Sequence, residues 1–309
     1  MKIFSGQSNL ELAEKIAKFT GVSLGKIELG TFSDGELRVA FKENIRGENV
    51  FLIQSTNPPA ENLMELLLML DAAKRASAKT VTAIMPYYGY SRQDRKDKPR
   101  VPISARMILD LISAAGVDRM VTMDLHSPQI QGFTNVPFDN LYSRITLFNQ
   151  LKEYKLNSSN GVVLAPDIGS AKMSQSYAKK LGIGFALIDK RRPKHNVAEV
   201  VNLIGDLNNK HVFIIDDMID TAGTICNASR TAMNNGAKSV VAVATHPVLS
   251  GPAIDRLKEA PIDKIIVSDT IKIQQEKIFD KLEIISVAEV FAEAIIRINQ
   301  GDSISELFK

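Results

Sequence analysis

The stretch Val212–Thr224, with the sequence VFIIDDMIDTAGT, constrains the fold of this chain more than any other segment. It begins with four apolar, mostly branched residues, a pattern typical of a parallel-sheet strand that is covered on both faces. Two aspartates, Asp216 and Asp217, follow where such a strand is expected to end. The small-residue turn Asp220–Thr224 then leads into an expected helix over Ile225–Met233. This order predicts a strand–turn–helix unit of an α/β fold.

The same turn has the composition of a receptor for a phosphorylated sugar. Backbone N–H groups at a helix N-terminus bind phosphate, and Gly223 permits a close approach of the backbone. The carboxylates of Asp216 and Asp217 suit ribose hydroxyl groups or a hydrated metal ion. A strand that ends in two solvated acids, followed by a threonine N-cap, is the alternative interpretation of these residues taken alone.

Short apolar runs alternate with helical patterns along the chain, which predicts right-handed crossovers and parallel sheets. In the first half we expect strands at 3–5, 50–54, 81–85 and 120–123, a hairpin from 27–30 and 36–41, and helices over 10–19, 61–76 and 103–115. After the polar segment Lys152–Asn160 the rhythm repeats, with strands at 162–165, 185–188, 240–245, 265–269 and 284–287 and a helix over 288–298. We therefore expect two domains, 1–145 and 146–287, with the C-terminal helix of about 288–309 packing back on the first.

Length and charge narrow the class of protein. A chain of 309 residues suffices for two ordinary domains. Its net charge of +3 is too small to indicate nucleic-acid binding. The only cysteine, Cys226, excludes an intrachain disulfide, as is usual in a reducing compartment. The N-terminus lacks a signal-peptide pattern, and no apolar run approaches the ~20 residues that span a bilayer. We expect a cytoplasmic protein that binds neither nucleic acid nor membrane.

Residues 86–102, PYYGYSRQDRKDKPRVP, interrupt the strand–helix rhythm of the first half. They contain three tyrosines and five Lys or Arg residues interleaved with two aspartates. The acids would repel a nucleic-acid backbone. Aromatic, arginine and glutamine side chains together suit an adenine and a polyphosphate, whereas a solvated loop is the alternative interpretation from composition.

Several short motifs follow one another in the first half: FSDGE at 32–36, NLMEL at 62–66, RASA at 75–78, YSRQDR at 90–95, DLH at 124–126 and QIQGF at 129–133. With the stretch 212–224 they resemble ribose-phosphate pyrophosphokinase (phosphoribosyl diphosphate synthetase) of the phosphate-activated, hexameric class, from about Ser5 to Phe308. The resemblance implies two tandem phosphoribosyltransferase-like domains, each with a mainly parallel central sheet flanked by helices. It also implies Mg²⁺-dependent transfer of the diphosphoryl group of ATP to the 1-hydroxyl of ribose 5-phosphate. The products would be 5-phosphoribosyl 1-diphosphate and AMP, for nucleotide biosynthesis.

The resemblance also assigns roles to individual residues. It places ATP on Phe32, Asp34, Gly35, Glu36, Arg92 and Gln93, with the hairpin residues reaching a neighbouring subunit. It places Mg²⁺ on His126 and Asp167, and transition-state stabilisation on Lys190 and Arg192. Ribose 5-phosphate falls on Arg192, Asp216, Asp217, Asp220, Thr221, Ala222, Gly223 and Thr224. Activation by inorganic phosphate and inhibition by ADP at a subunit interface fall on Arg46, Arg100, Ser127, Gln129, Asp139, Asn140, Ser303, Ser305 and Phe308.

Some assignments compete with simpler interpretations. Asp34 also suits an ordinary hairpin turn, a lone histidine at a strand end is typically structural, and Asp167 also suits a helix cap. Where the family usually has a second glycine and an arginine after Gly169, this chain has Ser170 and Met173, which leaves the local phosphate contacts open. Two alternative functions remain at this point. A phosphoribosyltransferase would share 212–224 without a use for the ATP motifs, and a non-catalytic regulatory subunit would have altered catalytic loops.

Overall fold

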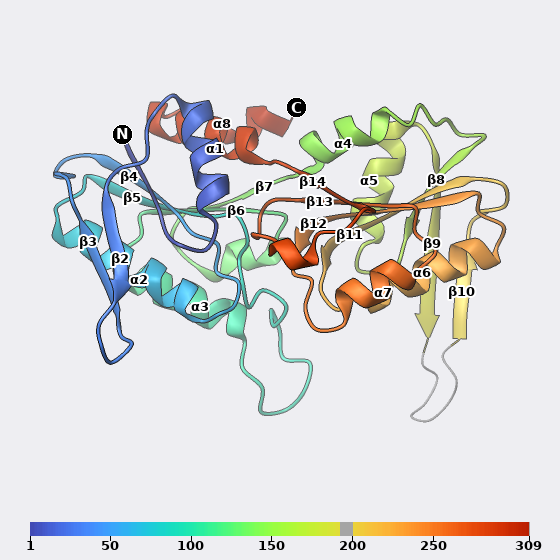
Figure 1. Cartoon of the computed structure of the whole chain (residues 1–309), viewed down its shortest axis with the longest axis horizontal. Helices are drawn as coiled ribbons and strands as arrows, with labels where there is room; N and C mark the ends of the chain where they lie inside the picture. The colour runs from blue at the N-terminus through green and yellow to red at the C-terminus, as the bar shows by residue number, and fades with distance from the viewer. Residues whose placement is uncertain (192–199, 309) are drawn as a thin grey trace. The chain divides into compact units, whose positions relative to one another are not determined.

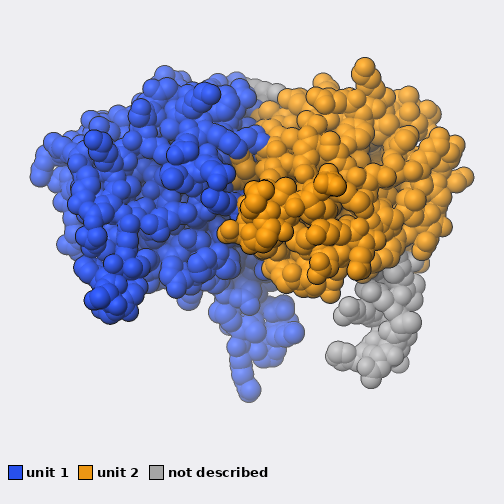
Figure 2. Space-filling view, in the orientation of Figure 1, with its two compact units in different colours: residues 1–143, 270–272, 286–309 blue, residues 144–269, 273–285 orange. Residues whose placement is uncertain are grey.

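The computed structural model describes residues 1–191 and 200–308, and the chain divides into two compact units (Figure 2). The first unit comprises residues 1–143, 270–272 and 286–309, and the second comprises residues 144–269 and 273–285. Each unit has a central, mainly parallel sheet with helices on both faces, so the expected fold class is confirmed. In the described part of the chain, no helix is long and apolar enough to cross a membrane.

The five-stranded sheet of the first unit is parallel throughout, in the order β1-β4-β5-β6-β7. Its strands are β1 (Lys2–Ser5), β4 (Asn49–Ile53), β5 (Thr80–Met85), β6 (Arg119–Met123) and β7 (Phe138–Leu141). Their side chains are mostly buried because helices cover both faces of the sheet. Parallel pairing brings the carboxyl ends of all five strands to one edge, where ligands of such sheets bind.

Four helices cover this sheet, two on each face. The first pair is α1 (Leu10–Thr20) and α8 (Ala288–Gln300), which lie side by side in Figure 1 and share one core cluster through Ile16 and Phe291. The second pair is α2 (Glu61–Arg75) and α3 (Ser104–Ala114), which pack in a separate cluster. Two short 3₁₀ segments, η1 (Pro128–Phe133) and η3 (Ile304–Phe308), complete the unit. Residues from both ends of the chain therefore build one core.

The sheet of the second unit has the order β10-β9-β8-β11-β12-β13-β14 and is parallel except for the pair β9–β10. Its strands are β8 (Gly161–Ala165), β9 (Gly184–Arg191), β10 (Val200–Ile204), β11 (His211–Ile219), β12 (Ser239–Pro247), β13 (Lys264–Ser268) and β14 (Leu282–Ile285). On one face lie α4 (Arg144–Lys152) and α5 (Ala171–Leu181). On the other lie α6 (Gly223–Asn234) and α7 (Ala253–Glu259), and η2 (Gln275–Lys277) follows β13.

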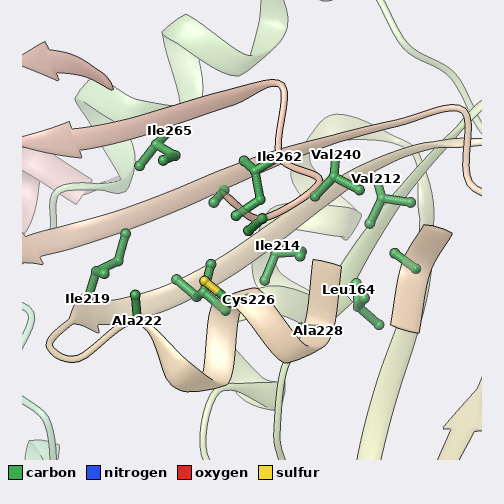
Figure 3. Close-up of a cluster of buried hydrophobic side chains, with 14 of the residues drawn as sticks. Leu164, Val212, Ile214, Ile219, Ala222, Cys226, Ala228, Val240, Ile262 and Ile265 are labelled. Carbon is green, nitrogen blue, oxygen red and sulfur yellow. The ribbon is translucent and has the colours of Figure 1, made fainter. Parts of the chain in front are cut away.

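The core beneath α6 fixes where the expected sugar-phosphate turn begins. Figure 3 shows Cys226 of α6 facing the branched side chains of the sheet, with Ile214 of β11 nearby and Val212 farther along the same strand. Ile219, which precedes the turn, and Ala222, which lies within it, are 1% and 5% exposed and belong to the same cluster. Ile225, directly after the turn, also belongs to this cluster, so buried apolar residues flank the turn on both sides.

The structure corrects two expectations about strand ends. Asp216 and Asp217 do not follow β11 but lie within it, because β12 extends to Pro247 and continues the pairing past the acids. Likewise, the segment 189–191 does not follow a strand. It belongs to β9 and pairs with β10, a strand that the sequence did not indicate.

Candidate active site

β11 carries the two expected sugar-binding acids to the carboxyl edge of the second unit's sheet. Asp216 pairs in register with Ala244 of β12, and Met218 pairs with His246. The backbone N–H of Asp217 donates to Oδ1 of Asp216 at 3.0 Å. Both acids remain partly exposed. The sheet thus fixes the backbone positions of both acids.

The surroundings of Asp216 disfavour the charged form of its carboxyl group. The pKa of Asp216 is raised well above its usual range, chiefly because burial disfavours the charged carboxylate. The negative charge of Asp217 is the next cause, and that of Asp167 follows. Three carboxylates of the second unit therefore repel one another. A cation or hydroxyl donors from a ligand would relieve this repulsion.

The turn Asp220–Thr224 presents backbone N–H groups at the start of α6. Ala222 is the N-cap and has left-handed backbone angles, φ 62° and ψ 4°, and no side chain caps the helix. Within the described residues, the backbone N–H groups of Gly223 and Thr224 have no protein acceptor. A Cβ atom placed on Gly223 would lie 3.7 Å from Arg256 Nη1 and 3.9 Å from Thr221 Oγ1, which are ordinary contact distances. Such a helix start is a binding site for phosphate.

The donor set suits Mg²⁺ that takes most of its ligands from outside the protein. Among the described residues, no group of three His, Cys, Asp or Glu side chains is placed to hold a metal ion by itself. Mg²⁺ is usually bound through one or two carboxylates, and waters and substrate phosphates complete its octahedron. The repulsion at Asp216 fits a divalent cation nearby, because a positive charge lowers the energy of all three carboxylates.

Asp167 follows β8, and the structure does not give it the helix-capping role: the N-cap of α5 is Ser170, and no side chain among the described residues caps that helix. The Asp167 Oδ1 accepts hydrogen bonds from the backbone N–H of Ser170 at 3.0 Å and from the Ser170 hydroxyl at 3.1 Å. Ser170 stands where the resemblance leads us to expect a glycine, and it is 6% exposed. Its two hydrogen bonds to Oδ1 orient the Asp167 carboxylate. The other departure, Met173, packs against the apolar cluster beneath α5. Neither departure removes an acidic group from the site.

In the first unit, the segment FSDGE, to which the resemblance assigns ATP binding, forms the tip of a hairpin. The antiparallel strands β2 (Ile27–Thr31) and β3 (Leu37–Phe41) flank it. Asp34 Oδ1 accepts the backbone N–H of Glu36 at 3.0 Å, and Gly35 has φ 96°, so these residues have turn-forming roles. The Phe32 side chain has no such role in forming the turn, because it is 53% exposed. The centroid of its ring lies 6.0 Å from the guanidinium carbon of Arg38. An exposed aromatic ring at a hairpin tip is suited to stacking on a base.

The loop of residues 86–102 is less exposed than its composition indicated. Tyr87 and Tyr88 are 4% and 2% exposed, and the hydroxyl of Tyr88 donates to the carbonyl of Ala105 at 2.7 Å. Only Tyr90 of the three is exposed. The Gln93 side chain accepts the hydroxyl of Ser104 at the start of α3, which fixes the loop there.

His126 lies in an exposed loop after β6, and buried polar residues hold that loop. The Asn140 Oδ1 accepts the backbone N–H of Leu125 at 3.0 Å. Asp124, with φ 39°, accepts the backbone N–H of Ser143 at 3.1 Å. His126 and Asp167, the two expected metal ligands, belong to different units.

The remaining expected residues have varied surroundings. Asp139 pairs with Arg119, and Ser127 donates to Gln129 at 2.8 Å. In the C-terminal segment the hydroxyls of Ser303 and Ser305 are 2.8 Å apart, and the rings of Phe308 and Tyr142 meet edge to face at 5.2 Å. Arg46 and Arg100 are exposed. The backbone of Lys190 lies in β9, and Arg192 lies outside the described residues.

Two residues that were not expected from the sequence make hydrogen bonds to the turn Asp220–Thr224, called the phosphate turn below. Ser250 donates through its backbone N–H to the carbonyl of Asp220 at 3.0 Å, and its hydroxyl bonds the Asp220 carboxylate. Arg256 donates to the carbonyl of Thr221 at 3.0 Å. They lie about thirty residues further along the chain, so no local pattern connects them to the turn.

Comparisons with known proteins cover the whole length of the chain. The family model for the N-terminal domain of ribose phosphate pyrophosphokinase matches residues 1–116, and the phosphoribosyl synthetase-associated domain matches residues 193–309. A ribose-phosphate pyrophosphokinase of Chlorobaculum tepidum is 51% identical over 308 residues, which cover 100% of this chain and 95% of the relative. Its counterpart in Caldanaerobacter subterraneus is 52% identical over 309 residues, covering 100% and 98%.

Among solved structures, a phosphoribosylpyrophosphate synthetase from Mycobacterium smegmatis is similar over nearly the whole fold. The TM-score is 0.91 at 39% sequence identity, and the match covers 97% of this chain and 99% of that one. The similarity in fold and in sequence therefore extends over both units of this chain.

Proposed function

This chain belongs to the ribose-phosphate pyrophosphokinase family of enzymes, and from that premise we propose that its second unit holds ribose 5-phosphate and its first unit supplies groups that bind ATP. Enzymes of this family transfer the diphosphoryl group of ATP to the 1-hydroxyl of ribose 5-phosphate and release AMP. The identity of about half of all positions, over the full length of the relatives, favours this reaction over that of a phosphoribosyltransferase or of a non-catalytic subunit.

The uncapped start of α6, directly after a strand with two accessible acids, is the observation that carries the ribose 5-phosphate assignment. The 5-phosphate receives hydrogen bonds from the backbone N–H groups of Gly223 and Thr224 and from the hydroxyls of Thr221 and Thr224. Asp216 and Asp217 accept hydrogen bonds from the ribose hydroxyls. Asp220 is held by Ser250 and shapes the turn.

In this proposal the enzyme requires Mg²⁺, and His126 and Asp167 are each assigned as Mg²⁺ ligands. When bound, the cation would neutralise charge on the transferring phosphoryl oxygens. Ser170 keeps the Asp167 carboxylate in place through two hydrogen bonds to Oδ1. His126 is an unusual ligand for Mg²⁺, which prefers oxygen, and its exposed position leaves it accessible to the nucleotide.

The adenine of ATP stacks on Phe32, and Arg92 and Gln93 contact the nucleotide. We assign the hairpin tip to the site of a neighbouring copy in a hexamer, as in the hexameric class of the family. The turn roles of Asp34 and Gly35 then serve to present Phe32 and Glu36. The exposure of Phe32 in a single chain supports this arrangement, because a partner would cover it.

The chemistry is an in-line displacement at the β-phosphorus of ATP. The 1-hydroxyl oxygen of ribose 5-phosphate forms a bond to this phosphorus and loses its proton. The bond between the β-phosphorus and the oxygen that bridges it to the α-phosphorus breaks, and AMP leaves with that oxygen. Catalysis therefore depends on alignment of the reactants and on neutralising charge. We assign the latter to Lys190 and Arg192.

We further propose regulation by inorganic phosphate and ADP at a subunit interface, and a cytoplasmic location. Among the residues assigned to this regulation, Asp139 and Asn140 already make structural contacts with Arg119 and Leu125. Their substitution is therefore expected to affect the fold of the first unit as well as regulation.

An assay of AMP release from ATP and ribose 5-phosphate tests the proposal. Activity requires both substrates and Mg²⁺. Asp216→Asn should raise the KM for ribose 5-phosphate by about tenfold or more, with little effect on that for ATP, since a charged hydrogen bond contributes about 1.5–3 kcal/mol. Asp206→Asn, an exposed aspartate of the same unit, is the matched control. Equal weakening of both substrates by Asp216→Asn would contradict the site assignment.

A second variant tests the transition-state assignment. Lys190→Ala should lower kcat by about a hundredfold or more, in the range found when a transition-state hydrogen-bond donor is removed. It should leave the binding of ribose 5-phosphate nearly intact. An unchanged turnover would remove Lys190 from the mechanism.

A further inference from the structure

Arg256 lies beside the phosphate turn although it belongs to a different helix. From α7 its Nη1 donates a hydrogen bond of 3.0 Å to the carbonyl oxygen of Thr221, across 35 residues of sequence. A Cβ atom built on Gly223 would lie 3.7 Å from the same nitrogen. The guanidinium is therefore next to the first turn of α6, where the 5-phosphate is proposed to bind.

The peptide that Arg256 contacts joins Thr221 to Ala222. In a planar trans peptide the C=O and N–H bonds point in opposite directions. A carbonyl fixed on Arg256 therefore directs the N–H of Ala222 away from the guanidinium contact. Ala222 is left-handed and the helix follows it, an arrangement in which successive N–H groups form an anion-binding concavity. The Ala222 N–H then joins those of Gly223 and Thr224.

Hydrogen bonds fix the carbonyls that precede Ala222 one after another. A left-handed conformation is unfavourable for a residue with a Cβ atom, and Ala222 adopts φ 62°. The preceding residues, Ile219 and Asp220, are held by backbone hydrogen bonds from Leu249 at 2.9 Å and Ser250 at 3.0 Å. For the carbonyl of Thr221, the described residues provide the side chain of Arg256.

We propose that Arg256 is a positioning residue for the substrate phosphate: it orients the Thr221–Ala222 peptide so that the Ala222 N–H faces the 5-phosphate of ribose 5-phosphate. This inference rests on the proposed function. The positive charge of Arg256 also favours a phosphate dianion at the start of α6. Because the side chain is exposed, the contact contributes little to the stability of the free chain, and its effect lies in substrate binding.

The test compares Arg256→Met, Arg256→Lys and Arg230→Met by steady-state kinetics with both substrates and by thermal unfolding. Arg230 is the matched control, because it is an exposed arginine on α6 whose guanidinium donates to Asn227 rather than to the turn. Arg256→Met should raise the KM for ribose 5-phosphate by about tenfold, the loss expected for one charge-assisted hydrogen bond. The KM for ATP, the kcat at saturation and Tm should stay unchanged. Arg256→Lys should recover part of the affinity, and Arg230→Met should equal the wild type.

Three results would overturn the inference. The first is a KM for ribose 5-phosphate within twofold of wild type in Arg256→Met. The second is an equal loss for both substrates with a lowered Tm, which would indicate a merely structural role. The third is an equal effect of Arg230→Met. Each presupposes a wild-type enzyme that releases AMP. Absence of that reaction in the wild type would instead refute the proposed function, so the two failures are distinguishable.

Discussion

Replacing Glu65 separates the effect of a buried charge from that of its hydrogen bonds. Glu65 lies on α2 and is 4% exposed. Its Oε1 accepts the backbone N–H of Gln7 at 2.7 Å and the Nε2 of Gln54 at 2.8 Å. Gln54 also accepts the N–H of Ser8 at 3.1 Å and donates to the carbonyl of Asn62 at 3.0 Å. The network holds the segment between β1 and α1 against the end of β4.

The two substitutions at this position should differ in size. Glu65→Ala leaves the Gln7 N–H and the Gln54 amide without their acceptor, and each hydrogen bond to a charged group is worth about 1.5–3 kcal/mol. Part of this loss of stability is offset, because burying the Glu65 carboxylate in the wild type itself costs free energy of folding. We expect a net loss of about 2–4 kcal/mol in the free energy of unfolding. Glu65→Gln keeps the acceptor and the shape, so it should change stability by less than about 1 kcal/mol.

The pH dependence gives the sharper measurement. Burial raises the pKa of Glu65, while the hydrogen bonds from Gln7 and Gln54 lower it by less. The folded state therefore binds this proton more tightly than the unfolded state does. The resulting stability is fully present below the unfolded pKa and is lost as the pH rises through the folded pKa. Glu65→Gln lacks this loss, so its stability relative to wild type should rise with pH.

Urea unfolding followed by circular dichroism at about pH 5 and about pH 8 measures both effects. Glu61→Gln, an exposed glutamate on the same helix, is the control. The reasoning is refuted if Glu65→Gln costs as much as Glu65→Ala, or if its difference from wild type is the same at both pH values.

Three further substitutions test other parts of the site. Phe32→Ala should raise the KM for ATP by about tenfold without lowering Tm, since stacking on an aromatic side chain is worth about 1–3 kcal/mol per base and the ring is 53% exposed; a lowered Tm would point to a folding role instead. Ser170→Ala should increase the Mg²⁺ concentration for half-maximal rate by a few fold, as is typical when a residue orienting a metal ligand is lost, and Ser158→Ala serves as the exposed control. Cys226→Ser should keep turnover, and a thiol reagent should label the native wild type slowly, because burial raises the pKa of Cys226; rapid labelling with loss of activity would contradict this.

Local patterns predicted the elements well but not where some of them end. The apolar run 212–215 identified β11, whereas its extension through Asp216 and Asp217 depends on the length of β12. The sequence cannot show this, because acids within a strand resemble acids after it. In the same way, residues 189–191 are polar and lie past the strand expected at 185–188, yet pairing with β10 places them in β9.

The composition of the loop 86–102 indicated more exposed side chains than the structure has, for a different reason. Tyr87 and Tyr88 are amphipathic and their hydroxyls can be satisfied in a core, as Tyr88 shows with its bond to Ala105. The opposite error concerns Ser250 and Arg256, which were not singled out. Their other contacts with the turn Asp220–Thr224 go to backbone carbonyls, which leave no signature in its side chains, and the bond from the Ser250 hydroxyl to the Asp220 carboxylate spans thirty residues of sequence.

The two units have similar sheets, but the polar groups at the carboxyl ends of their strands differ in hydrogen bonding. This difference is the reason why only the second unit is proposed to bind the sugar phosphate. In the first unit some polar groups at this edge bond one another: Asp124 accepts the backbone N–H of Ser143, and Ser55 donates to the carbonyl of Thr270 at 2.7 Å. In the second unit, the backbone donors at the start of α6 have no protein acceptor within the described residues, and burial and the neighbouring acids disfavour the charged form of Asp216. An edge whose donors and charges are left for a ligand gains free energy only when that ligand binds, which is the property a substrate site requires.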